Sequence, residues 1–132
     1  MYKFIIKFTV ILLLTITGYV SAAAQTTVTF NLDMKRALQD SLFIPSTDKV
    51  ILVGDVRPLN EINEIYLRDE EPIDSIFTAE VTFKRYLDGD QISYNFVLDT
   101  QSKKYEEPRP RSLRLSGNDM ILPPIQFGAT AW

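Results

Sequence analysis

The chain contains no cysteine and no histidine, and each absence excludes common chemistry. Without cysteine there is no disulfide, no thiolate zinc site and no thiol nucleophile. Without histidine the chain lacks the commonest general base and the commonest metal ligand. Glycine is scarce, with 5 in 132 residues, and no Gly/Ser linker or internal repeat divides the chain. A chain of this length holds at most one ordinary domain.

The N-terminus has the features of a secretory signal peptide. Lys3 and Lys7 supply positive charge, residues 8–20 are apolar, and residues 22–24 are alanines that provide an A-x-A cleavage pattern. The apolar run is shorter than the ~20 residues that a spanning helix needs. This length favours cleavage before Gln25 over an uncleaved membrane anchor.

We therefore expect residues 1–24 to be a signal peptide and residues 25–132 to be a single module, secreted or periplasmic, with no membrane span after cleavage. Loss of the two signal-peptide lysines changes the formal net charge from −3 to −5. An acidic module is a poor partner for nucleic acid, whose binding depends on basic side chains that neutralise phosphates. The same charge disfavours binding to anionic membrane surfaces.

Short runs of alternating apolar and polar residues, separated by turn residues, predict an all-β domain. Met34, Leu38 and Leu42 lie four apart and predict one short helix. Pro123 and Pro124 interrupt the last expected strand. The expected strands cover residues 27–34, 49–53, 76–83, 91–99, 104–107, 111–115 and 120–127, with a short one inside the irregular stretch 55–75. The pattern predicts an antiparallel β-sandwich of about seven strands.

Two pairs of segments resemble known secreted modules. Residues 94–97 (Tyr-Asn-Phe-Val), followed by residues 105–113, resemble the C-terminal half of a starch-binding carbohydrate-binding module of the family 20 type. Residues 28–34 and 119–127 resemble the beginning and end of secreted Bacteroidetes-type immunoglobulin-like modules. The resemblance implies an antiparallel immunoglobulin-like β-sandwich that binds carbohydrate without catalysing a reaction.

The same resemblance implies a carbohydrate-binding site at Tyr105, Glu106 and Asn95. Tyr105 stands where the family has a stacking tryptophan, and Glu106 matches the family's glutamate. Asn95 replaces a lysine, Pro110 replaces an asparagine, and residues 54–61 lack the family's other stacking ring. These departures favour an alternative function, a structural or protein-interaction sandwich that has lost sugar binding.

The residues themselves leave two interpretations of Tyr105 and Glu106. A ring beside a carboxylate can stack on a sugar and accept its hydroxyl protons. Alternatively, the tyrosine packs across a hairpin while the glutamate is solvated. The expected partner is accordingly a polysaccharide, such as an α-glucan, or another protein. An enzyme is the weakest prediction, because no serine lies in a nucleophile elbow, and no cofactor or metal site is predicted.

Three further features have plain structural interpretations. Residues 69–71 are acidic but lack the spacing of a calcium loop, which favours a solvated loop. Trp132, the only tryptophan, could be an exposed stacking ring, a cap on the core or part of a tail. Basic residues that could meet an anionic polysaccharide or a partner, or more simply protect sheet edges, gather late in the chain. They are Lys103, Lys104, Arg109, Arg111 and Arg114, of which Arg111 is expected to be structural.

Overall fold

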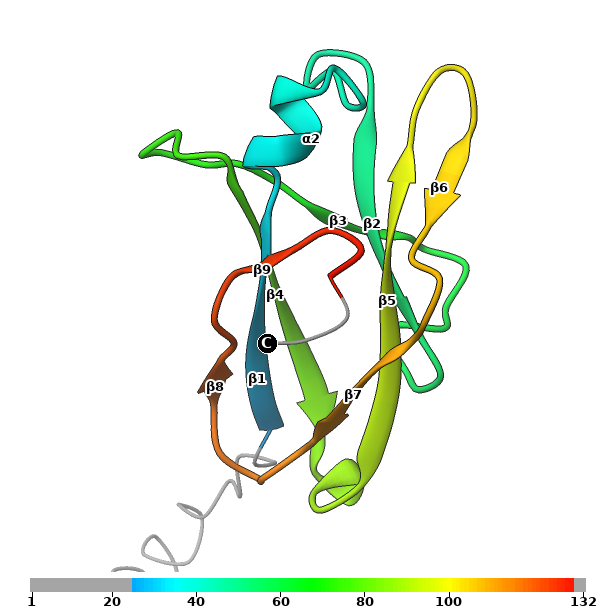
Figure 1. Cartoon of the computed structure of the whole chain (residues 1–132). Coiled ribbons are helices and arrows are strands. Elements are labelled where there is room, and N and C mark those ends of the chain that lie inside the picture. Colours follow the sequence, from blue (N-terminus) through cyan, green and yellow to red (C-terminus); the bar gives the residue numbers. More distant parts are fainter. Residues whose placement is uncertain (1–24, 130–132) are drawn as a thin grey trace, which may run out of the picture.

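The computed structural model describes residues 25–129 (Figure 1). The predicted signal peptide, residues 1–24, and Trp132 lie outside this range. Neither helix within it has the length and the apolar character that crossing a membrane requires. The elements are β1 (Gln25–Asp33), α2 (Lys35–Gln39), β2 (Lys49–Gly54), β3 (Ile65–Leu67), β4 (Ile76–Lys84), the 3-10 helix η1 (Arg85–Leu87), β5 (Gln91–Asp99), β6 (Lys104–Glu106), β7 (Arg111–Arg114), β8 (Met120–Ile121) and β9 (Ile125–Gln126).

The strands form two sheets. In sheet A, β1 lies between β4 on one side and β8 and β9 on the other. In sheet B the order is β3-β2-β5-β6, and β7 also pairs with β5. Figure 1 shows β1 and β4 side by side in one layer, with β2 and β5 in the other. The predicted all-β sandwich is confirmed.

The core lies between the sheets and follows from the alternation of each strand. In β1, Val28, Phe30 and Leu32 are fully buried, while the residues between them are only partly buried. The Phe30 ring meets Tyr94 of β5 edge-to-face, with ring centroids 5.0 Å apart. A strand points successive side chains to opposite faces, so one apolar row per strand is enough to fill the space between two sheets.

Two features of the topology differ from the sequence prediction. The expected last strand is divided around Pro123 and Pro124 into β8 and β9, because proline has no N–H to give to a ladder. Both pieces pair with β1 in parallel, whereas an entirely antiparallel arrangement was expected. The chain crosses from β7 to the other sheet and then runs alongside β1 in the same direction (Figure 1).

The short strand β3 forms one edge of sheet B and links the two layers. Ile51 of β2 pairs with Tyr66 in the middle of β3. The next residues turn toward sheet A, where Arg68 makes an isolated antiparallel bridge with Thr78 of β4. The irregular stretch 55–75 therefore contains the expected short strand. This strand lies at the edge of sheet B that is next to β4.

Candidate functional site

Tyr105 and Glu106 point to opposite sides of sheet B. Tyr105 pairs with the buried Leu98 and packs against the core, whereas Glu106 pairs with Val97 and is exposed. The Lys103 ammonium nitrogen lies 4.4 Å from the centre of the Tyr105 ring. The structure therefore does not bring Tyr105 and Glu106 together on one surface, because neighbours in a strand face opposite ways.

Asn95 lies on the outer side of sheet B, where it holds a loop. With the amide oriented so that its nitrogen faces two carbonyl oxygens, Asn95 donates to the oxygen of Arg109 at 3.0 Å and to that of Tyr94 at 3.2 Å. Asn95 also lines a shallow hollow of about 260 Å³ with Pro110 and Gly54. Three positions that the starch-binding resemblance singled out, Gly54, Asn95 and Pro110, thus line the same hollow.

This hollow beside Asn95 offers no ring on which a sugar could stack. Tyr94 is the aromatic residue in its lining, and its side chain is only 2% exposed. The Asp55 carboxylate there already accepts a hydrogen bond from the Ser93 N–H at 2.9 Å. A Cβ on Gly54 would lie 2.6 Å from a Leu59 methyl carbon, so glycine is required by close packing. The hollow is therefore built mainly from structural contacts.

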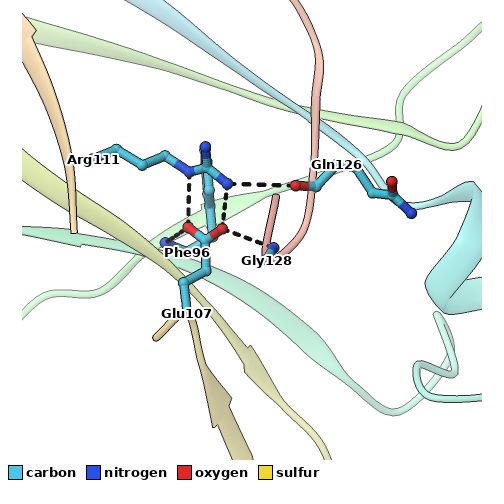
Figure 2. Close-up of polar contacts among 5 residues, drawn as sticks. All are labelled: Phe96, Glu107, Arg111, Gln126 and Gly128. Atoms are coloured by element: carbon cyan, nitrogen blue, oxygen red, sulfur yellow. Dashed lines mark hydrogen bonds and ion pairs between the residues drawn. The ribbon is translucent and has the colours of Figure 1, made fainter. Parts of the chain in front are cut away.

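A buried ion pair, which the resemblance did not assign to the site, forms the centre of a polar cluster (Figure 2). Glu107 and Arg111, with side chains 1% and 8% exposed, form a two-pronged salt bridge. The Glu107 carboxylate also accepts hydrogen bonds from the Phe96 N–H at 3.1 Å and from the Gly128 N–H at 2.9 Å. Arg111 reaches the Gln126 carbonyl at 3.4 Å. The cluster ties the segment after β9 to sheet B.

This buried cluster is structural. Glu107 accepts four hydrogen bonds, which uses the acceptor capacity of a carboxylate and leaves none for a ligand. Burial also removes Arg111 from the basic surface group, as expected for a structural arginine. The Arg114 side chain also has a protein partner, because it donates a hydrogen bond to the Gly89 carbonyl at 2.8 Å. The predicted basic cluster is therefore not one continuous surface.

A different ring, Tyr66 of β3, lies between two hollows at the edge of sheet B. One hollow has a volume of about 450 Å³ and the other about 390 Å³. Tyr66 and Arg68 line both. Lys49 of β2 lines the larger hollow, and Glu80 of β4 lines the smaller. An aromatic ring with charged groups on either side is the arrangement that the Asn95 hollow lacks.

The Tyr66 ring is partly exposed and makes two side-chain contacts. The phenol donates to a Glu64 carboxylate oxygen at 2.7 Å, and the Lys49 ammonium lies 5.0 Å from the ring centre. The hydrogen bond to Glu64, with smaller contributions from burial and nearby acidic charge, raises the pKa of Tyr66 above 10.0. The phenol is therefore neutral at ordinary pH.

Some polar groups around Tyr66 hold loops, while others are available to a ligand. Asp48 accepts a hydrogen bond from the Ile44 N–H at 2.8 Å, and Asp69 accepts one from the Ser75 N–H at 2.9 Å. In contrast, the side chains of Lys49 and Arg68 make no ion pair with any of residues 25–129. In the acidic stretch 69–71, Asp69 therefore stabilises its own loop. Residues 25–129 contain no group of three acidic side chains that could hold a metal ion.

The carbohydrate-binding site predicted from the sequence did not include Tyr66. It lies in the least regular stretch of the chain, without the alternation that marks the longer strands. The available signal was an aromatic residue with charged neighbours at Glu64 and Arg68, in a segment rich in turn residues. Glu107 was also overlooked, although its spacing of four residues from Arg111 allows an ion pair.

Comparison with known proteins does not decide between these surfaces. No family model matches the chain. No curated protein matches it either. The starch-binding resemblance therefore stays a prediction.

Proposed function

We propose that this protein is a secreted or periplasmic, non-catalytic module that binds a neutral polysaccharide, such as an α-glucan. The single observation that carries the proposal is the partly exposed Tyr66 ring between two hollows of about 450 and 390 Å³. Both the resemblance to starch-binding modules and the all-β sandwich support the same class of ligand.

The chemistry around Tyr66 suits a sugar. A rigid aromatic ring provides apolar area for the C–H face of a pyranose at little entropic cost. Lys49 and Arg68 supply hydrogen-bond donors for hydroxyl oxygens. The net negative charge of the chain disfavours an anionic polysaccharide.

A second candidate is a structural or protein-interaction sandwich without sugar binding. The inward packing of Tyr105 favours this function, because it removes the ring that the starch-binding resemblance assigned to the ligand. Asn95 uses its amide to hold a loop, and the hollow beside it has no exposed ring. Under this alternative the charged groups around Tyr66 contact only water or a partner protein.

Isothermal titration with maltoheptaose and with soluble starch tests the proposal. We expect binding by the native protein, at least about a tenfold loss of affinity in Tyr66→Ala, and no change in the matched control Tyr86→Ala. Tyr86 is a suitable control because it is 69% exposed and lies on η1, outside the hollows beside Tyr66.

Two results would overturn the proposal. Absence of binding to every glucan tried would favour the protein-interaction function. Equal binding by the native protein and Tyr66→Ala would place any sugar site elsewhere on the molecule. The variant Glu106→Ala tests separately the exposed glutamate that the family resemblance had assigned to the ligand.

A further inference from the structure

The longest free sheet edge in residues 25–129 belongs to β4. One side of β4 pairs with β1 along its whole length, from Ile76 to Lys84. Sheet A ends at β4, so the other side has no continuous partner in the described part of the chain. A single bridge to Arg68 occupies this side, at Thr78. An unpaired edge of this kind is a template for another strand.

The bridge at Thr78 establishes which backbone groups face the free edge. The Thr78 N–H donates to Arg68 and its carbonyl accepts from Arg68, at 2.9 and 3.1 Å. In an antiparallel pair, the N–H and C=O groups of successive residues face alternate sides of the strand. The backbone groups of Glu80, Thr82 and Lys84 therefore point away from β1, in the same direction as those of Thr78.

The free stretch has defined ends. The bridge between Arg68 and Thr78 closes it on one side. On the other side β4 ends at Lys84, and the chain turns into η1. Residues 80–84 remain, with Thr82 at their centre.

We propose that β4 pairs antiparallel with β4 of a second copy of this chain, with Thr82 opposite Thr82. In this register each outward-facing residue of one copy meets an outward-facing residue of the other, and each such pair exchanges two backbone hydrogen bonds. The contact is isologous, so a two-fold axis closes it as a dimer. This inference does not rest on the proposed sugar binding.

Charge complementarity identifies a second copy as the partner. Glu80 and Lys84 are exposed and make no ion pair within residues 25–129. They cannot meet in their own strand, where four residues span about 13 Å. Under the two-fold axis Glu80 of each copy lies opposite Lys84 of the other. Opposite charges and a Thr–Thr pair at directly facing positions stabilise an antiparallel ladder.

Sedimentation velocity over a concentration series tests the pairing. We expect a concentration-dependent dimer of the native protein, weakened at high salt. Glu80→Lys and Lys84→Glu should each reduce the association constant at least about tenfold, because each places like charges opposite each other at two positions. An equimolar mixture of these two variants should recover the dimer, since every facing pair then carries opposite charges.

Matched controls change the same charge elsewhere. Glu71→Lys and Lys35→Glu alter exposed residues outside β4 and should leave the association constant unchanged. Circular dichroism melting checks that every variant is folded. A native protein that stays monomeric at all concentrations would overturn the pairing. So would a dimer that both β4 variants leave intact, or a mixture of the two that stays monomeric.

Discussion

Two polar regions of this molecule use similar residue types in opposite ways. Around Glu107 and Arg111 every carboxylate oxygen is paired, and both side chains are almost fully buried. Around Tyr66, two hollows open to solvent, and the side chains of Lys49 and Arg68 form no ion pair with the described residues. A charged pair by itself therefore does not mark a binding site in this sandwich.

The difference follows from the position of each region in the fold. Glu107 and Arg111 lie where the segment after β9 crosses against sheet B, so water is excluded and each polar atom needs a protein partner. Tyr66 lies on the edge strand β3, where water can satisfy its charged neighbours. Buried polar groups thus hold the architecture, while solvated groups at the edge are free to contact a ligand.

The largest expected effect is on the buried pair. Glu107→Ala leaves Arg111 and two backbone N–H groups without their acceptor, which should reduce the free energy of unfolding by about 3–5 kcal/mol. Chemical denaturation measures this loss. The neighbouring exposed Glu106→Ala is the matched control, with an expected change within about 0.5 kcal/mol. Similar losses in both variants would contradict the comparison.

The two tyrosines should separate stability from binding. Tyr105→Ala removes a ring that packs against the core and should lower the free energy of unfolding by about 1–3 kcal/mol. Tyr66→Ala should cost less stability, because that ring lies at a sheet edge and is not packed against the core cluster, yet it should cost most of the glucan affinity. Thermal melting and titration of the same samples measure both quantities. A larger stability loss in Tyr66→Ala would contradict this separation.

Alkaline pH should lower the free energy of unfolding through Tyr94, a core residue near the buried pair Glu107 and Arg111. Burial raises the pKa of Tyr94 to about 12, while the Arg111 guanidinium acts in the opposite direction. The unfolded chain releases this proton near 10.0 and the folded chain keeps it, so stability falls as pH rises from about 10 to about 12. Denaturation across this range should show a smaller fall in Tyr94→Phe than in the native protein. An unchanged fall would exclude Tyr94 as a contributor.

The smallest effect concerns the phenol at the open edge. Glu64→Gln removes the charged acceptor of the Tyr66 hydroxyl, so the pKa of Tyr66 should move back toward 10.0. NMR titration of the tyrosine ring carbons measures this shift. Because the ring is at the surface, the change in unfolding free energy should stay within about 0.5 kcal/mol. A pKa that does not move would show that another group holds the phenol.

Strand prediction succeeded where alternation was long. Residues 91–99 were expected as a strand and form β5 with those bounds. The short helix near Leu38 was expected from spacing and occurs as α2. The prolines at 123 and 124 correctly indicated an interruption, but nothing local indicated that both remaining pieces pair in parallel with β1. Pairing partners far apart in the chain are selected by packing, which local periodicity does not describe.

The candidate site was less predictable than the fold. Adjacency in the sequence suggested that Tyr105 and Glu106 act together, but the pleat of β6 sends them to opposite sides. Tyr66 gave little signal because β3 has only three residues. Its surroundings come from residues far apart in the chain, Lys49 on β2 and Glu80 on β4.

The sequence alone determined the class of this protein: an all-β sandwich in which cysteine and histidine chemistry is absent, and in which Arg111 is structural. Alternation of apolar and polar residues and the positions of turn residues are local properties, so they can be recognised in the sequence without knowledge of the fold. Only the tertiary structure decided which ring packs against the core, which carboxylate is saturated and which strand edge is free. Each of these depends on what covers a group, and the covering residues come from distant parts of the chain.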